Sequence, residues 1–365
     1  MHEPRPLHPV TREYLDVLSD EVGIMQHAKG SRPDPAHGYC TDDVARALQV
    51  DLLHQRELGW GAVEASAWRY VRFLDEALNG GAGRFLNFRR VGGSWHEGTG
   101  SEDCQGRAML ALGETMALAP DEDLVEFAAS LFSQALPAAQ GVWAIRAQAS
   151  VLLGCDAAMQ SMPNEATERA YGLLAARLSS TFDVRPGSAW PWPESRLTYE
   201  NALPVRALIV AGRSFDSRPM IDRGLELLDW LIDAQTAPTG HLSPIGNGWW
   251  SRDRDKSQFD QQPIEATALL LAAESAYLVT EHAKYRTAVE QAYAWFLGGN
   301  DRGVHVAVPE QGAGFDGLTP RGVNTNQGAE STLMWLMASE HVRAFREGES
   351  VGAVAPGSRR LAATL

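Results

Sequence analysis

Carboxylic acids and amides recur along this chain where apolar, alanine-rich segments begin. The clearest clusters lie in Thr41–Leu48, Ser101–Leu110, Thr198–Leu208, Phe259–Leu271 and Asn326–Leu336, with a weaker one, lacking an acid, in Trp143–Leu153. Paired carboxylates can protonate a leaving oxygen and activate water, and amides recognise hydroxyl groups by directed hydrogen bonds. The pattern therefore predicts a protein that acts on carbohydrate.

Helical register narrows the choice among these acids. Adjacent residues of a helix point about 100° apart, so Asp42 and Asp43 cannot both face one pocket. Asp42 is spaced to pair with Arg46, which leaves Asp43 facing the pocket, and Asp103 is spaced to pair with Arg107. Acids in a first helical turn are also favoured by the helix dipole, so a simple capping role stays open for any single cluster.

Four carboxylates are predicted to be catalytic, without an assignment of acid and base: Asp43, Asp103, Glu200 and Asp260. Aromatic, acidic and amide neighbours are predicted to bind substrate. They are Tyr39, Asp42, Trp95, Glu102, Arg107, Trp190, Trp192, Glu194, Tyr199, Asn201, Trp250, Gln261, Gln262, Glu265, Asn326, Gln327 and Glu330. Flat aromatic faces suit the apolar C–H faces of sugar rings, although each tryptophan could instead anchor its loop on the core.

Hydrophobic periodicity predicts twelve helices, because apolar residues recur at helical spacing in nearly every long segment. The expected ranges are 12–29, 41–57, 61–78, 101–118, 121–136, 142–157, 164–182, 198–213, 217–235, 262–280, 283–297 and 326–345. Residues Thr41, Ser101, Thr198 and Asn326 are expected N-caps, and Pro263 suits a first helical position.

The predicted links alternate in length, and the long ones, with one exception, precede the even-numbered helices. Short links join antiparallel neighbours, so the long loops should meet at one end of the molecule. This arrangement predicts an all-α fold, an (α/α)6 toroid with six inner and six outer helices. An open helical solenoid is the alternative, but its repeats should have more uniform loops. We expect one catalytic domain over residues 1–345 and a flexible tail over 346–365.

Composition excludes several partners. The sequence has 32 lysines and arginines and 46 aspartates and glutamates, which give a formal charge of −14. A negative charge of this size disfavours binding to nucleic acid or to an anionic membrane. The chain shows no signal core and no apolar run of about 18 residues, so a cytoplasmic location is expected. The sequence has only 3 cysteines, which are too scattered for a disulfide framework or a zinc site.

Other chemistries lack their motifs. The sequence contains no phosphate-binding glycine loop, nucleotide fingerprint, HExxH or serine nucleophile elbow. We therefore expect no cofactor and no metal. Histidines His37, His96, His241 and His305 fall in the predicted rim loops, where a proton shuttle is conceivable but has no motif to support it.

The segments TDDVARAL, SEDCQGRA, WPWPESRLTYENA, FDQQPIEA and NTNQGAESTL resemble a bacterial group labelled glycosyltransferase-like or uncharacterised. Its members are similar in layout to (α/α)6 glycosidases, and some accompany mannoside phosphorylases. The resemblance spans about His37 to Leu336 and implies the toroid. Because the chain has no nucleotide-sugar motif, the resemblance does not imply a transferase here.

These observations together predict a glycoside hydrolase that acts on a manno- or gluco-configured oligosaccharide, with inversion at the anomeric carbon. An epimerase or isomerase on the same toroid is the second hypothesis, and it would need a pair of bases, usually histidines. A non-catalytic glycan-binding protein is the third. The sequence leaves the linkage, exo or endo action and the oligomeric state open.

Overall fold

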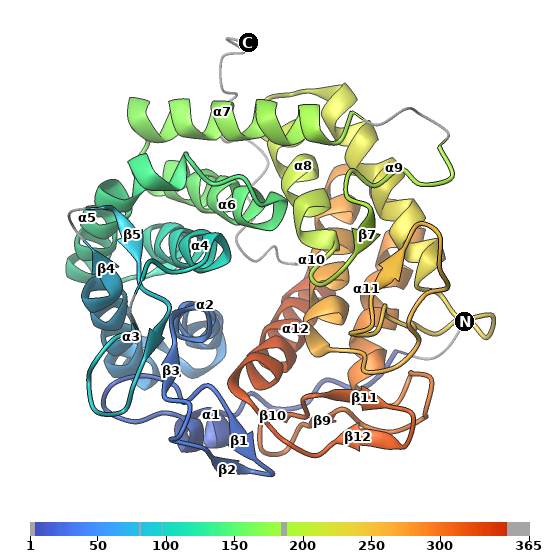
Figure 1. The fold of residues 1–365 in the computed structure, drawn as a ribbon, viewed down its shortest axis with the longest axis horizontal. Helices are drawn as coiled ribbons and strands as arrows, with labels where there is room; N and C mark the ends of the chain where they lie inside the picture. The colour runs from blue at the N-terminus through green and yellow to red at the C-terminus, as the bar shows by residue number, and fades with distance from the viewer. Residues whose placement is uncertain (1–3, 80–81, 97, 184–187, 349–365) are drawn as a thin grey trace.

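A computed structural model describes residues 4–79, 82–96, 98–183 and 188–348. The chain folds as the predicted (α/α)6 toroid (Figure 1). Its inner ring consists of α2 (Thr41–Leu58), α4 (Glu102–Leu118), α6 (Ile145–Ser161), α8 (Ala202–Ser214), α10 (Pro263–Thr280) and α12 (Ala329–Glu347). Each inner helix contacts the next, and α12 contacts α2, so the ring is closed. The open solenoid is therefore excluded.

An outer helix precedes or follows each inner one and packs on its outer face. The outer helices are α1 (Glu13–Leu18), α3 (Glu64–Ala77), α5 (Glu122–Ala139), α7 (Glu165–Thr181), α9 (Arg218–Ala234) and α11 (Ala283–Phe296), and a 3-10 turn, η1 (Trp60–Ala62), leads into α3. No helix within the described residues is long and apolar enough to cross a membrane.

The first helix is much shorter than predicted. Instead of 12–29 it covers only Glu13–Leu18. The carboxylate of Asp20 accepts hydrogen bonds from the backbone N–H groups of Val22 (2.8 Å) and Gly23 (3.1 Å). Such a side-chain turn competes with helical hydrogen bonding, so the helix ends and the chain continues into short strands.

Two expected helix starts are also wrong. Helix α8 begins at Ala202 rather than at Thr198, because Asn201 accepts a hydrogen bond from the Thr198 N–H (3.1 Å) and holds a turn there. Helix α12 begins after Gly328, not after Asn326. The cap at Ser101 is confirmed, since its hydroxyl accepts from the Cys104 N–H at 3.0 Å. Helix α12 also runs two residues past the predicted end at 345, and residues 349–365 of the expected tail lie outside the described residues.

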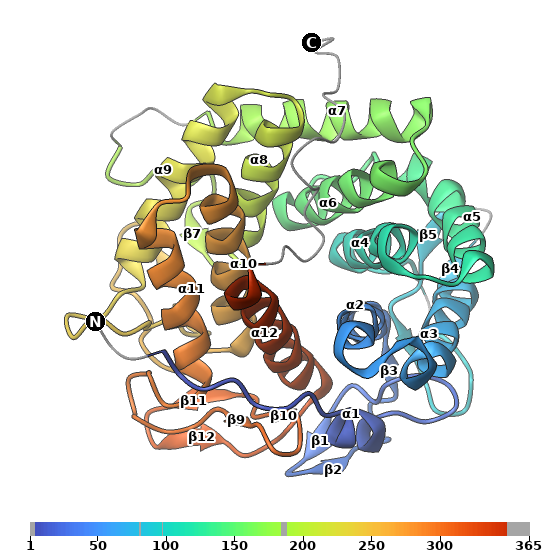
Figure 2. The ribbon, with the colours of Figure 1, turned by 180° about the vertical axis from the view of Figure 1, so that it is seen from behind.

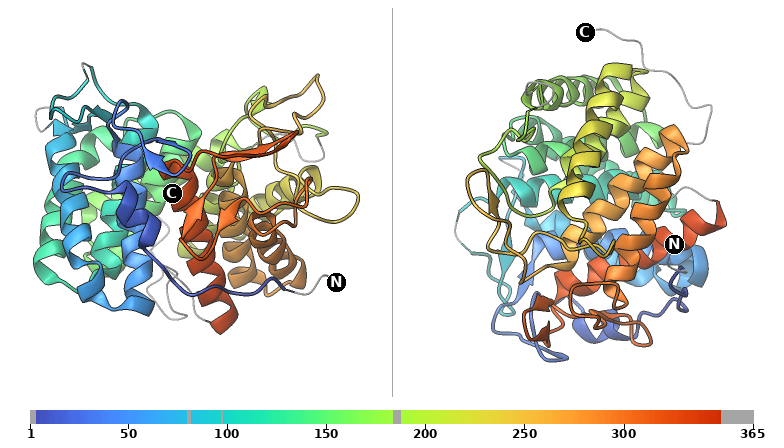
Figure 3. Two further views of the ribbon diagram at one scale, coloured as in Figure 1. Left: turned by 90° about the horizontal axis from the view of Figure 1, so that it is seen from below. Right: turned by 90° about the vertical axis from the view of Figure 1, so that its right-hand side faces the viewer.

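Short antiparallel strand pairs occupy the long loops, which lie at one end of the helix ring (Figure 3). The strands are β1 (Ala28–Lys29), β2 (Arg32–Pro33), β3 (Tyr39–Cys40), β4 (Leu78–Asn79), β5 (Arg84–Phe85), β6 (Phe88–Arg89), β7 (Arg196–Leu197), β8 (Trp250–Ser251), β9 (Ala307–Val308), β10 (Ala313–Gly314), β11 (Gly317–Thr319) and β12 (Gly322–Asn324). Pairs β3–β6 and β7–β8 join different loops, so the loops brace one another. We call this end, at the N-termini of the inner helices, the rim.

The N-terminal segment before α1 crosses the opposite side of the ring, as the view from behind shows (Figure 2). Backbone carbonyls of Pro6 and Arg5 accept hydrogen bonds from Tyr293 on α11 (3.0 Å) and Arg346 on α12 (2.8 Å). Farther on, Arg12 forms an ion pair with the buried Asp51 of α2. This segment thus ties the last helices to the first at the point where the ring closes.

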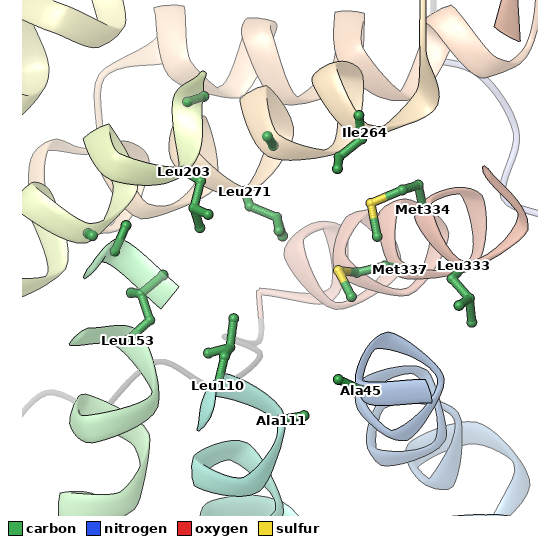
Figure 4. Close-up of a cluster of buried hydrophobic side chains, with 14 of the residues drawn as sticks. Ala45, Leu110, Ala111, Leu153, Leu203, Ile264, Leu271, Leu333, Met334 and Met337 are labelled. Carbon is green, nitrogen blue, oxygen red and sulfur yellow. The ribbon is translucent and has the colours of Figure 1, made fainter. Parts of the chain in front are cut away.

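Apolar side chains of the inner helices point toward the axis of the ring below the rim (Figure 4). Leu110, Leu203, Leu271 and Met334 come from four different helices and are buried together. Burial of this kind contributes roughly 1.5–3 kcal/mol per large side chain. The polar residues at the rim therefore stand on an apolar floor.

Helices α4 and α6 touch backbone to backbone. A Cβ atom placed on Gly113 would lie 2.1 Å from the carbonyl oxygen of Gly154, and one on Gly154 would lie 2.5 Å from that of Met109. Neither glycine has a positive φ, so close approach is the reason that glycine is required. This glycine contact sets the distance between α4 and α6, which both contribute residues to the rim.

We predict that Gly113→Ala lowers the free energy of unfolding by roughly 1–3 kcal/mol, since the added methyl overpacks the α4–α6 contact. The matched control is Gly172→Ala on α7, where an added Cβ meets nothing within 4 Å. In that control the free energy of unfolding should rise by about 0.5–1 kcal/mol, because alanine has a higher helix propensity than glycine. Urea denaturation of both variants checks this, and an equal or opposite ranking would contradict the contact.

Candidate active site at the rim

Three arginines, each within the first two turns of an inner helix, organise the rim. Arg46 of α2 lies 3.0 Å from both Asp43 and Glu330, so it joins α2 to α12. Arg107 of α4 lies 2.7 Å from Glu200 in the loop before α8. The network thus connects residues from opposite ends of the sequence.

Arg107 is the most densely paired of the three. Besides Glu200, its guanidinium lies 3.6 Å from Asp42 and 3.9 Å from Asp103. Burial alone would lower the pKa of Arg107, but Glu200, Asp42 and Asp103 raise that pKa well above its ordinary value. It stays charged and holds three carboxylates from three segments around one point.

The third arginine, Arg146 of α6, lies 3.2 Å from Glu194 and donates to the side-chain oxygen of Asn201 at 2.9 Å. It also donates to the backbone carbonyl of Tyr199 and lies over that ring, 4.6 Å from its centroid. The weak acid-free cluster of the sequence therefore contributes a cation that binds the loop before α8.

The predicted pairing within Asp42 and Asp43 is wrong. Asp43 pairs with Arg46 at i,i+3, whereas Asp42 faces Arg107 on the neighbouring helix. Asp42 keeps one buried carboxylate oxygen without a hydrogen bond. A helix start with two consecutive aspartates can satisfy one locally and one across the ring, which spacing alone does not indicate.

Burial raises the pKa of two carboxyls of the rim. Burial raises the pKa of Asp43 to about 7, although Arg46 opposes the shift. Burial likewise raises the pKa of Glu265 to about 7, although Asn201 donates to this carboxylate from its backbone (2.8 Å) and side chain (2.7 Å). Perturbed carboxyls of this kind are frequent where proton transfer occurs.

The loop before α8 holds its carboxylate in a strained backbone. Glu200 has φ 48°, a left-handed conformation that costs a non-glycine residue about 1 kcal/mol or more. Its neighbour Tyr199 donates a hydrogen bond from its hydroxyl to Asp103. Burial is the main cause that raises the pKa of the Tyr199 phenol, and the negative charge of Asp103 raises it further. Strain at Glu200 is offset by its ion pair with Arg107, so the geometry of the loop and of the network depend on each other.

Several predicted substrate-binding residues make structural contacts. Tyr39 is buried and donates to Asp20 at 2.5 Å. Gln261 is fully buried and donates to Asp301 at 2.5 Å while accepting from Trp295 at 2.9 Å. Both side chains are therefore held by contacts inside the protein, and their predicted role in substrate binding stays a prediction.

The tryptophans of the predicted aromatic wall mostly pack on one another. Trp190, Trp230 and Trp250 have ring centroids 5.1–5.7 Å apart, and Trp192 is completely buried beside them. Trp192 also donates to Glu194 at 3.0 Å. This cluster anchors the two loops joined by β7 and β8, and Trp230 and Trp250 are its half-buried members.

Glu102 also has a structural contact. Its carboxylate accepts hydrogen bonds from the backbone N–H groups of Trp143 (2.8 Å) and Ala144 (2.6 Å). Helix α6 has no side-chain cap of its own, so an acid on α4 caps it from outside. Trp143 itself is 70% exposed, with Arg177 over its ring, and is an aromatic surface that the sequence analysis did not select.

The remaining predicted residues lie at the periphery of the network. Asp260 is exposed, has φ 58°, and forms no ion pair with a described residue, so its catalytic role stays a prediction. Trp95 packs edge-on against Phe73, and Asn326 accepts from the Gly30 N–H at 3.0 Å. Gln262 is half-buried at the start of α10, and Gln327 is buried with a side-chain oxygen that has no partner.

One acid and one histidine of the rim escaped the sequence analysis. Asp316 accepts from the Gly328 N–H at 2.8 Å, and burial raises its pKa. Burial lowers the pKa of the nearby His27. The positive charge of His37, whose ring centroid lies 4.6 Å from that of His27, lowers it further. Neither lies in an acid cluster before a helix, so no local pattern marked them. Among the described residues, no three histidines, cysteines or acids are grouped as a metal would require.

A cavity of about 500 Å³, including solvent at its mouth, lies beneath the arginines. Arg46, Arg107 and Glu200 line its upper part, and Leu110 and Met337 line its lower part. This axial cavity joins the charged rim to the apolar floor.

No protein-family model matches the chain, and no curated protein matches it. Several solved structures match the chain in fold. Cellobiose 2-epimerase from Bacillus thermoamylovorans is 12% identical with a TM-score of 0.70, covering 92% of this chain and 96% of its own. D-mannose isomerase is 12% identical with a TM-score of 0.67, covering 90% of this chain and 94% of its own.

Glycosidases share the layout as well. The α-1,6-mannanase of a Salegentibacter species is 12% identical with a TM-score of 0.60, covering 90% of this chain and 95% of its own. An inactive variant of that mannanase, with two consecutive aspartates replaced by asparagine, is solved with α-1,6-mannotriose. At these identities the shared property is the fold, and the resemblance to glycosyltransferase-like proteins stays a prediction.

We predict that Glu102→Ala lowers the free energy of unfolding by about 1–2 kcal/mol, because two backbone N–H groups of the α6 start lose their acceptor. Glu122→Ala is the matched control, since Glu122 occupies the same first position of α5 and is exposed. The Glu122→Ala variant should lose a few tenths of a kcal/mol of unfolding free energy at most. Thermal and urea unfolding measure both, and equal losses would count against the external cap.

Proposed function

We propose that this protein is a glycoside hydrolase that cleaves an oligosaccharide at the rim, with Asp43 as the proton donor. The observation that supports this most directly is the consecutive pair that opens α2. Burial raises the pKa of Asp43 to about 7, and Asp42 presents a carboxylate oxygen without a hydrogen bond beside Arg107. A protonated acid and an ionised carboxylate are the two groups that glycoside hydrolysis requires.

The reaction follows from these groups. The Asp43 carboxyl gives its proton to the glycosidic oxygen as the bond to the anomeric carbon breaks. A carboxylate held by Arg107, namely Asp42, Asp103 or Glu200, then assists water at that carbon or bonds to it. The inactive mannanase variant supports the pair, because Asp42–Asp43 is the only place where this sequence has two consecutive aspartates.

Manno-configured substrates are the first to test, since mannanase and mannose isomerase are both among the similar folds. The half-buried Trp250 and the exposed Trp143 are the proposed stacking surfaces, and Glu330 and Glu194, whose side chains are each 39% exposed, are proposed to accept sugar hydroxyls. Proton NMR of the anomeric signal immediately after cleavage reports whether the predicted inversion occurs.

We predict that Asp43→Asn lowers kcat on a mannooligosaccharide by at least about 10²-fold while the fold is kept. Asp123→Asn, an exposed acid in the first turn of α5, is the control and should retain full activity. Product formation is followed by chromatography. An Asp43→Asn variant with unchanged kcat would show that the proton donor lies elsewhere.

The pH dependence has a definite sign. A general acid works when protonated, so wild-type kcat should fall as the pH rises through about 7. Stability should follow the same group, because a carboxyl whose pKa is raised in the folded state binds a proton that the unfolded chain has already released. That contribution is complete below about pH 4 and is lost as the pH rises to about 7. Urea unfolding of wild type and Asp43→Asn over this range should show a smaller slope in the variant, because Glu265 and other carboxyls with raised pKa values still contribute there.

A sugar epimerase is the second candidate. It is favoured by the TM-score of 0.70 to cellobiose 2-epimerase and by His27, which is exposed at the rim near Asp316 and Glu330. Incubation of cellobiose and mannobiose in deuterated water decides between the two. Deuterium at a sugar carbon with the disaccharide intact supports the epimerase, and free monosaccharide supports the hydrolase.

A further inference from the structure

A second cavity opens at the end of the ring opposite the rim. It has a volume of about 560 Å³, including solvent at its mouth. Its walls come from the C-terminal halves of α4, α6 and α10 and from α8, and the residues that matter are Glu114, Asp156, Arg206, Arg213, Glu274 and Leu278. The proposed hydrolysis uses none of them.

Glu274 leaves an acceptor unused in this wall. One oxygen of its carboxylate lies 2.7 Å from Nδ1 of His341, but the other is buried without a hydrogen-bond partner. The side chain as a whole is only 5% exposed. A buried carboxylate oxygen without a donor costs about 1–3 kcal/mol, so a ligand that donates there is favoured.

Two arginines leave donors unused across the same cavity. Neither Arg206 nor Arg213 forms a salt bridge with a described residue, and the Nε of Arg206 is buried without a partner. The other acids of the wall are already engaged. Glu114 accepts from Gln49 at 2.8 Å, and Asp156 accepts from Tyr171 at 2.8 Å and Ser214 at 2.7 Å.

The mixture of charges selects the ligand. A simple anion would meet Glu114 and Glu274, and a simple cation would meet Arg206 and Arg213. A hydroxyl group both donates and accepts, so neighbouring hydroxyls can serve Glu274 and the arginines together. Leu153, Ile209 and Leu278 supply apolar walls that suit the C–H faces of a polyhydroxylated ligand.

We propose that this opposite cavity binds a neutral polyhydroxylated molecule of monosaccharide size. The opposite cavity is separate from the rim but shares one residue with the axial cavity. Arg206 lines both this cavity and the axial cavity beneath Arg46 and Arg107. An occupant therefore bonds to a side chain that also borders the candidate active site.

The test is direct binding to the full chain, measured by saturation-transfer NMR and calorimetry with D-mannose, D-glucose, inorganic phosphate and putrescine. Leu278→Trp fills the mouth from a partly exposed position, and Leu173→Trp on the outer helix α7 is its matched control. Arg213→Met removes one donor without filling the cavity. Melting curves establish that each variant is folded.

A neutral sugar should bind saturably to wild type and to Leu173→Trp, and at least about tenfold more weakly to Leu278→Trp and Arg213→Met. Sugar binding that both variants retain would place the ligand at the rim and overturn the proposal. Saturable binding of phosphate or putrescine in place of sugar would overturn the assignment of a neutral ligand, as would no binding at all. Because the readout is binding, the result does not depend on whether the protein is a hydrolase.

Discussion

Closure of the ring is the constraint on which the rest of this structure depends. Six inner helices around one axis must each contact two neighbours and turn a third face inward, so they need small or apolar residues on nearly every side. Glycines at the α4–α6 contact and the leucines and methionines of the axis meet that demand. Since hairpin connectivity points all six helices the same way, their N-termini gather at one rim.

That geometry concentrates polar groups. The helix dipole favours acids at the start of an inner helix, and α2, α4, α10 and α12 each have at least one acid in their first turn. The acids of several helices then come within a few ångströms of one another, which would be unfavourable without counter-charge. Arg46, Arg107 and Arg146 supply it. The arginines are thus required by the same closure that brings the acids together.

The loops add what the helices cannot. The left-handed backbone at Glu200, the hydroxyl of Tyr199 on Asp103 and the tryptophan cluster behind β7 and β8 all position the segment before α8 over the ring. Asn201, at the end of this segment, donates to the buried Glu265, and burial raises the pKa of both Glu265 and Asp43. A rim with both protonated and ionised carboxyls is the property that proton-transfer chemistry on sugars uses.

The sequence by itself determined the helical periodicity, the alternation of long and short links, and therefore the toroid and the end of it where the acids lie. These are local properties, set by side chains within one or two turns of each other. It could not determine which acid pairs with which arginine, because Arg107 meets Glu200 across 93 positions and Tyr199 meets Asp103 across 96. Nor could it decide whether Tyr39, Trp192 or Gln261 faced solvent, since irregular loops have no period that marks an inner side. Tertiary structure decided both, because pairing across helices and burial of loop residues depend on where the closed ring places distant segments.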